Sequence, residues 1–150
     1  MAEIVSIVYK PEEMEQPAGR YLRVPLEKAR LVAGYGIEGD AKGGHPRRQL
    51  NIMSADTLAA LAAEGFTVEP GCMGEQIIVR GLDVDRLAAG DRLRLGRTAT
   101  IEVIQPRTGC DRFEAYQGKH PKEAAGRLGV IAAVVASGVI RVGDPVAADV

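Results

Sequence analysis

Residues 50–65 have the sequence LNIMSADTLAALAAEG, which contains a strand, a helix start and a helix end in succession. The apolar run from Leu50 to Met53 predicts a short buried strand. Ser54 is a favourable N-cap for a helix through Ala63. Gly65 is well placed to end that helix, because glycine readily adopts the left-handed conformation found after helix C-termini. This is the best-supported helix in the sequence.

Outward from this segment, short apolar runs recur between Gly, Pro and Asp, as is typical of β-strands bounded by turns. Residues 34–44 carry five glycines and are predicted to be irregular. A short helix is predicted over Pro121–Leu128, with proline in its first turn. The further predicted strands are Ile4–Tyr9, Tyr21–Val24, Ala29–Ala33, Ile77–Val79, Arg92–Leu95, Ala99–Ile104, Val130–Val135 and Pro145–Val146.

This pattern predicts one domain over residues 1–150, because no linker or repeat divides the chain. The fold class is mainly β with a few short helices (α+β), in a barrel or a sandwich-like sheet. Parallel βαβ winding would need more helices than the sequence offers.

Composition restricts the function. The chain has 19 basic and 20 acidic residues, and a formal charge of −1 does not support nonspecific nucleic-acid binding. Two cysteines are too few for a disulfide framework, which favours thiols in a reducing compartment. There is no secretory signal at the N-terminus, and the longest apolar run, 129–135, is far shorter than a membrane span. We therefore expect a soluble, cytoplasmic protein without a nucleic-acid or membrane partner.

The glycine-rich segment GIEGDAKGGH, residues 36–45, is the first candidate for ligand binding. Glycines allow close approach of the backbone to a ligand and turn N–H groups toward an anion. The segment includes Gly39, Asp40 and His45, and is followed at once by Arg47, Arg48 and Gln49. Guanidinium groups suit phosphate or carboxylate. The alternative is a surface loop with solvated charges, in which Asp40 only caps the loop.

The second candidate is PGCMGEQ, residues 70–76, which leads into a predicted strand. Gly74 makes a tight entry to the strand, and Glu75 and Gln76 could face a pocket. Cys72 has small and apolar neighbours and is interpreted as a packed structural thiol.

The third candidate is RTGCDR, residues 107–112, directly after the predicted strand 99–104. A thiol in a polar loop beside arginine is well placed for a lowered pKa, so Cys110, with Arg107 as its electrostatic neighbour, is the best candidate for chemistry. The alternative is an incidental exposed thiol. Neither His45 nor His120 has a partner at zinc-like spacing, and His120 is expected at the surface.

The order of these motifs resembles the MOSC family, named after the C-terminal domain of the molybdenum cofactor sulfurases. The similarity extends over roughly Leu31 to Val146. Its motifs are Gly-x-x-Gly-Asp at 36–40 with Arg-Gln at 48–49, Pro-Gly-x-x-Gly-Glu at 70–75, Gly-Asp at 90–91, Arg-x-x-Cys at 107–110, and the ending GVIAAVVASGVIRVGDPV at 129–146.

The resemblance implies a closed or partly closed β-barrel and a molybdopterin-type molybdenum cofactor. It implies that Cys110 carries sulfur as a persulfide or is the thiolate ligand of molybdenum. It gives Arg47 and Arg48 a phosphate to bind, and places Gly39, Asp40, His45, Gln49, Gly74 and Glu75 around the cofactor. The chain has no room for the pyridoxal-phosphate domain of the sulfurases, so a separate cysteine desulfurase or redox partner is expected. Gly109 stands where many members have proline.

Three functions remain open from the sequence. The first is a sulfur-transfer or carrier role, with Cys110 as persulfide acceptor. The second is a molybdenum-dependent reductase of N-hydroxylated compounds that needs an external electron donor. The third is a non-catalytic anion-binding or regulatory module.

Overall fold

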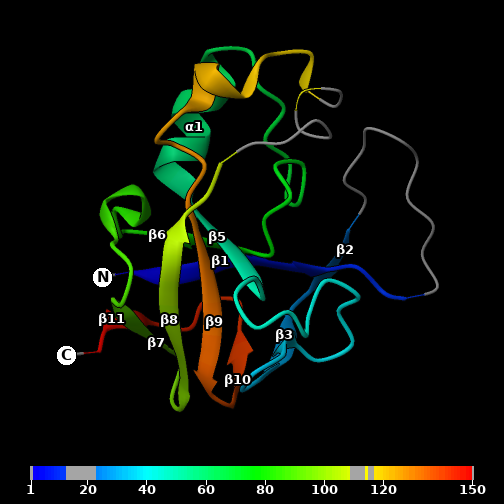
Figure 1. Ribbon diagram of the computed structural model, residues 1–150, viewed down its shortest axis with the longest axis vertical. Coiled ribbons are helices and arrows are strands. Elements are labelled where there is room, and N and C mark those ends of the chain that lie inside the picture. The colour runs from blue at the N-terminus through cyan, green and yellow to red at the C-terminus, as the bar shows by residue number, and fades with distance from the viewer. Residues whose placement is uncertain (1, 13–22, 109–113, 115–116, 150) are drawn as a thin grey trace.

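The computed structural model describes residues 2–12, 23–108, 114 and 117–149 (Figure 1). These residues are predominantly β-structure, with the α-helix α1 (Ala55–Ala63) and the short 3-10 helices η1 (Val84–Arg86) and η2 (Pro121–Ala124). Glu114 and Gln117 are also helical. The strands are β1 (Glu3–Tyr9), β2 (Val24–Leu26), β3 (Lys28–Val32), β4 (Gly36–Ile37), β5 (Leu50–Ser54), β6 (Ile77–Arg80), β7 (Arg92–Leu95), β8 (Ala99–Pro106), β9 (Val130–Ala136), β10 (Gly138–Arg141) and β11 (Val146–Ala148). The mainly β class with few helices is confirmed.

The strands form two sheets, and neither closes into a barrel within the described residues. The larger sheet has the order β11-β7-β8-β9-β5-β6-β1-β2, and the smaller one has the order β10-β3-β4. An open groove of about 720 Å³ lies where β1 and β2 meet β3 and β10. We predicted a closed or partly closed barrel, and the closure is wrong, because neither sheet of the described residues closes on itself. At this seam the backbone contacts between β1 and the segment before β11 amount to an isolated bridge, Glu3 with Pro145, and a few single hydrogen bonds.

The segment that decides the fold has the predicted structure. The Ser54 side chain accepts a hydrogen bond from Thr57 N, and Gly65 has a φ of 95° after the helix. Helix α1 connects β5 to β6, and these two strands are parallel. A single βαβ unit is thus present in a sheet whose other strand pairs are antiparallel.

Two apolar clusters lie on opposite sides of β5 and β6. Alternate residues such as Ile52 and Ile77 belong to the main core between the two sheets. Met53 and Ile78, which point to the other face, pack under α1 with Leu58. Figure 1 shows α1 at one end of this face. The remainder of the face is available for the polar residues described below.

Several elements differ from the prediction. The glycine-rich segment is not irregular throughout, because Gly36–Ile37 pairs with β3 as strand β4. Strand β10 was not predicted; it follows β9 after the single residue Ser137 and pairs with β3. The helix predicted over Pro121–Leu128 is only a 3-10 turn over Pro121–Ala124, and the backbone leaves helical geometry at Ala125, whose ψ is 133°.

Strand β2 begins later than predicted. It covers Val24–Leu26 and is the terminal strand of the larger sheet, with Pro25 inside it. An edge strand tolerates proline because one side of it needs no backbone donor. Tyr21 lies outside the described residues.

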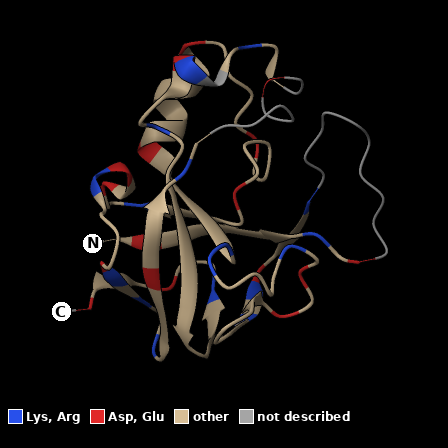
Figure 2. Ribbon diagram, viewed as in Figure 1, with Lys and Arg blue, Asp and Glu red and all other residues tan. Residues whose placement is uncertain are grey.

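Charged residues of both signs are interspersed over the loops, strands and helices (Figure 2). In the described part of the chain, no helix has the length and apolar character needed to cross a membrane.

Candidate functional site

A buried polar cluster lies at the N-terminal ends of β5 and β6. Because the two strands are parallel neighbours, Asn51 and Gln76 come to the same edge of the sheet. Asn51 N donates to Gln76 Oε1 at 2.7 Å, and Gln76 N donates to Asn51 O at 3.0 Å. This double contact fixes the second predicted motif, 70–76, against the start of β5.

Asp40 connects the glycine-rich loop to the cluster. Its carboxylate is fully buried; Oδ1 accepts hydrogen bonds from Lys10 N and Lys42 N, each at 3.1 Å. Oδ2 accepts from Gln76 Nε2 at 3.3 Å. Both carboxylate oxygens thus accept hydrogen bonds from the protein, and these bonds attach the glycine-rich loop to Lys10 and Gln76.

Gln49 is also buried and lies beneath the same loop. Its Oε1 accepts a hydrogen bond from Val134 N at 2.9 Å. Gly36 has a φ of 121°, and a Cβ on it would lie 3.0 Å from Gln49 O. Only glycine allows the loop to approach β5 this closely.

Glu75 is fully buried in the turn that precedes β6. Its two oxygens accept from Gly71 N at 2.7 Å and Met73 N at 3.0 Å. Burial raises the pKa of Glu75 above its ordinary value. The hydrogen bonds from backbone N–H groups, and to a smaller extent the charge of Arg107, partly offset this rise. Gly74, with a φ of 83°, is buried beside it.

Arg107 follows β8 and is only 7% exposed. Its backbone N–H donates a hydrogen bond to Gly129 O at 3.0 Å. Gly129 has a φ of 75°, and a Cβ there would lie 2.0 Å from Ile52 O, so this crossing requires glycine. Arg107 is thus a buried cation at the strand end that leads toward Cys110. Cys110 itself lies outside the described residues.

Asn51 is a member of the cluster that the sequence reasoning missed. Its Nδ2 donates to Gly74 O at 3.1 Å, whereas its Oδ1 is buried and accepts no hydrogen bond within the described structure. Leaving a buried acceptor unsatisfied costs about 1–3 kcal/mol. A signal was present, since Asn51 is the only asparagine in the chain and interrupts an apolar strand.

Other predicted residues lie at the surface. His45, Arg47 and Arg48 are exposed, and His45 Nδ1 accepts from Arg47 N at 3.1 Å. Gly39 is exposed with a φ of 86°. These residues belong to the loop above the buried cluster, and their side chains are not part of it.

Two further predictions concern Cys72 and His120. Cys72 is buried, as expected for a packed thiol. His120 is exposed and its side chain caps η2 by accepting from Lys122 N at 3.1 Å. Among the described residues, no group of three or more His, Cys, Asp or Glu side chains could hold a metal ion.

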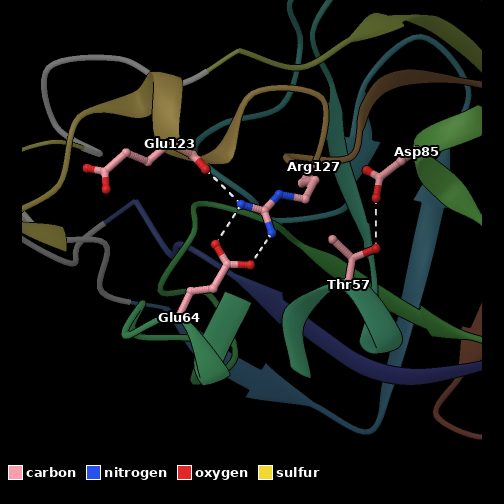
Figure 3. A network of polar contacts seen from close by, with 5 residues as sticks. All are labelled: Thr57, Glu64, Asp85, Glu123 and Arg127. Carbon is pink, nitrogen blue, oxygen red and sulfur yellow. Dashed lines mark hydrogen bonds and ion pairs between the residues drawn. The ribbon is translucent and has the colours of Figure 1, made fainter. Parts of the chain in front are cut away.

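The chain that returns to β9 after the Cys110 motif is attached to α1 and the loop that follows α1. Gln117 Oε1 accepts from Thr67 N at 2.7 Å, and its Nε2 donates to Thr67 O at 2.9 Å. Arg127 forms a two-pronged ion pair with Glu64 and donates to Glu123 O (Figure 3). The same view shows Thr57 Oγ1 donating to Asp85. Polar contacts thus fix this return segment to the protein body.

Comparison with protein families identifies the class. The MOSC domain family matches residues 39–147, and the chain belongs to this family. No significant match was found among curated protein sequences.

Solved structures share the fold. The chain resembles YuaD from Bacillus subtilis with a TM-score of 0.75 and 19% identity, covering 97% of this chain and 94% of that one. It resembles YiiM from Geobacillus stearothermophilus with a TM-score of 0.76 and 21% identity, covering 100% and 76% of the two chains. For YiiM from Escherichia coli the TM-score is 0.72, the identity 22%, and the coverage 99% and 70%.

Proposed function

We propose that this MOSC protein binds a molybdopterin-type molybdenum cofactor over the polar cluster, and that Cys110 is its sulfur carrier or its thiolate ligand to molybdenum. The observation that carries the proposal is the burial of Arg107, a cation that is only 7% exposed and lies three residues before Cys110. Membership of the family associated with this cofactor supports the same conclusion.

The residues of the cluster fit such a group chemically. The cofactor carries a phosphate, and Arg47 and Arg48 on the exposed loop suit a phosphate. The pterin ring carries N–H donors, and the buried acceptor Asn51 Oδ1 lacks a donor within the described structure. Arg107 supplies positive charge in a region that also contains the carboxyl groups of Asp40 and Glu75.

Within this proposal each residue has a separate task. Arg47 and Arg48 hold the phosphate, while Gly39, His45 and the buried Asp40 and Gln49 shape and support the loop that carries them. Gly74 and Glu75 form the turn beneath the ring. When bound, the cofactor supplies a redox-active metal held by dithiolene sulfurs.

Cys110 performs the sulfur chemistry in the carrier role. Its thiolate attacks the terminal sulfur of a persulfide on a separate cysteine desulfurase. A new S–S bond forms on Cys110, the S–S bond of the donor breaks, and the donor cysteine leaves as a thiolate, so no external oxidant is needed. The guanidinium of Arg107 favours the thiolate that starts the reaction.

Sulfane sulfur measured by cyanolysis tests this role. Protein incubated with a desulfurase and cysteine should release cyanide-reactive sulfur, and Cys110→Ala should release none. Cys72→Ala is the matched control, because it removes the other, buried thiol and leaves Cys110 in place. Equal sulfur release from wild type and Cys110→Ala would contradict the carrier role.

The same protein distinguishes the two alternatives. Oxidation of a reduced electron donor that depends on an N-hydroxylated substrate, and that Cys110→Ala abolishes, would assign the reductase. Absence of both sulfur loading and donor oxidation, with anion binding retained, would leave the non-catalytic module.

A further inference from the structure

In the side-chain amide of Asn51, the nitrogen makes a hydrogen bond and the oxygen makes none with the described residues. Its Nδ2 donates to Gly74 O at 3.1 Å, and Gly74 O is an acceptor, so it selects the amino end of the amide. Rotating the amide by half a turn would place two oxygens against each other. The Oδ1 atom therefore stays on the side that has no donor among the described residues.

The surroundings of Asn51 prevent it from turning away. Its backbone N–H is bonded to Gln76 Oε1 at 2.7 Å, and Gln76 Nε2 is bonded to Asp40. Asp40 in turn accepts hydrogen bonds from the backbone N–H groups of Lys10 and of Lys42, the latter in the glycine-rich loop. This chain of hydrogen bonds fixes Asn51 between the loop and the turn before β6.

We propose that Asn51 is a specificity-determining residue whose Oδ1 accepts an N–H of the ligand ring, so that the site prefers pterins over pteridines without ring N–H groups. The proposal rests on the proposed cofactor site and adds the residue that selects the ring. A preorganised acceptor that is satisfied only by the ligand favours rings with a donor, because a ring without one leaves the acceptor unpaired.

Fluorescence titration tests the proposal directly, since the chain has no Trp and pterins are fluorescent. The probes are 6-hydroxymethylpterin, which carries N–H donors, and 1,3-dimethyllumazine, a pteridine whose ring N–H groups are methylated. Wild-type protein should bind the first about tenfold or more tightly than the second, which corresponds to one hydrogen bond. This comparison needs no variant, so it is informative even if a substitution impairs folding.

Two variants assign the preference to Asn51. Asn51→Leu removes both ends of the amide and should abolish the preference. Asn51→Asp keeps an acceptor but places a second oxygen against Gly74 O, so it should weaken the binding of both probes and retain most of the preference. Gln105→Leu removes an exposed amide on β8 and is the matched control, which should behave as wild type.

The outcomes separate this inference from the proposed function. If wild type prefers the pterin and Asn51→Leu does so equally, the acceptor role is wrong and another group, such as a water molecule, satisfies Oδ1. If Asn51→Asp loses the preference together with Asn51→Leu, the contact with Gly74 is what matters and the acceptor role is again overturned. If wild type binds neither probe, the proposed cofactor site fails as well.

Discussion

The two faces of β5 and β6 differ in what they bury. On the face toward the smaller sheet, Leu50, Ile52, Ile77 and Val79 are all apolar and fully buried. On the opposite face, Asn51 and Gln76 precede Met53 and Ile78, so a polar half adjoins an apolar half beneath α1. The first face has no polar group to orient, whereas the second places its polar groups in fixed hydrogen bonds.

The difference indicates that one face of these two strands provides stability and the other provides fixed polar geometry. Burial of the apolar face provides stability that depends on area and not on direction. The polar half gains little net stability from each hydrogen bond and loses much if one is broken. Such a network is retained where specific geometry is needed, which is why the candidate site is assigned to this face.

The largest effect is expected on the apolar face. Ile52→Ala removes a fully buried side chain of the main core and should lower the free energy of unfolding by about 2–5 kcal/mol. Urea denaturation measures this loss. Because Ile52 points away from the polar cluster, the pterin preference of the folded fraction should not change. A changed preference would contradict the separation of the two faces.

A smaller effect is expected on the polar half. Gln76→Leu removes the hydrogen bonds of the Gln76 side chain to Asn51 N and Asp40 Oδ2, each with a net contribution of about 0.5–1.5 kcal/mol. Hydrogen exchange should accelerate at the amide of Asn51 and, if the loop loosens with Asp40, at Lys42. Unchanged exchange at both amides would show that the network does not fix the loop.

The smallest effect concerns the pH dependence of stability. The pKa of Glu75 is raised above 4.5 in the folded state, mainly by burial, so the folded protein holds this proton more tightly than the unfolded chain. Its stabilising contribution is complete below the unfolded pKa and is lost as the pH rises through the folded pKa. Over that window, wild type should lose stability relative to Glu75→Gln by at most about 1.4 kcal/mol per pH unit. Parallel denaturation curves of the two proteins from pH 4 upward measure the difference, and identical pH slopes would contradict it.

Much of the fold follows from local sequence signals. Ser54, the alanine- and leucine-rich run after it and Gly65 define α1 because capping and propensity act over a few residues. Strand β10 and the two-residue β4 were missed because their pairing with β3 is a long-range contact. The open seam between the sheets likewise depends on which strands meet in space, which periodicity does not encode.

Several candidate site residues were chosen from the sequence alone, and the structure shows their burial and hydrogen bonds. Residue type and order selected Asp40, Glu75 and Arg107, and the structure buries all three. Their roles differ from the simplest expectation, since Asp40 and Glu75 are bonded to the backbone of neighbouring loops. The unsatisfied Oδ1 of Asn51 required the structure, because the lack of a donor among the described residues becomes visible only when the surrounding groups are in place. Cys110, the chemically central prediction, lies outside the described residues and stays a prediction.

Elemental analysis with pterin fluorescence, on protein purified from cells that make the cofactor, tests the central claim most directly. The account predicts equimolar molybdenum and pterin in wild type and in the Cys72→Ala control. Loss of molybdenum alone in Cys110→Ala would assign Cys110 as the metal ligand, and retention of both would assign it as the sulfur carrier. Wild-type protein with neither molybdenum nor pterin would contradict the account.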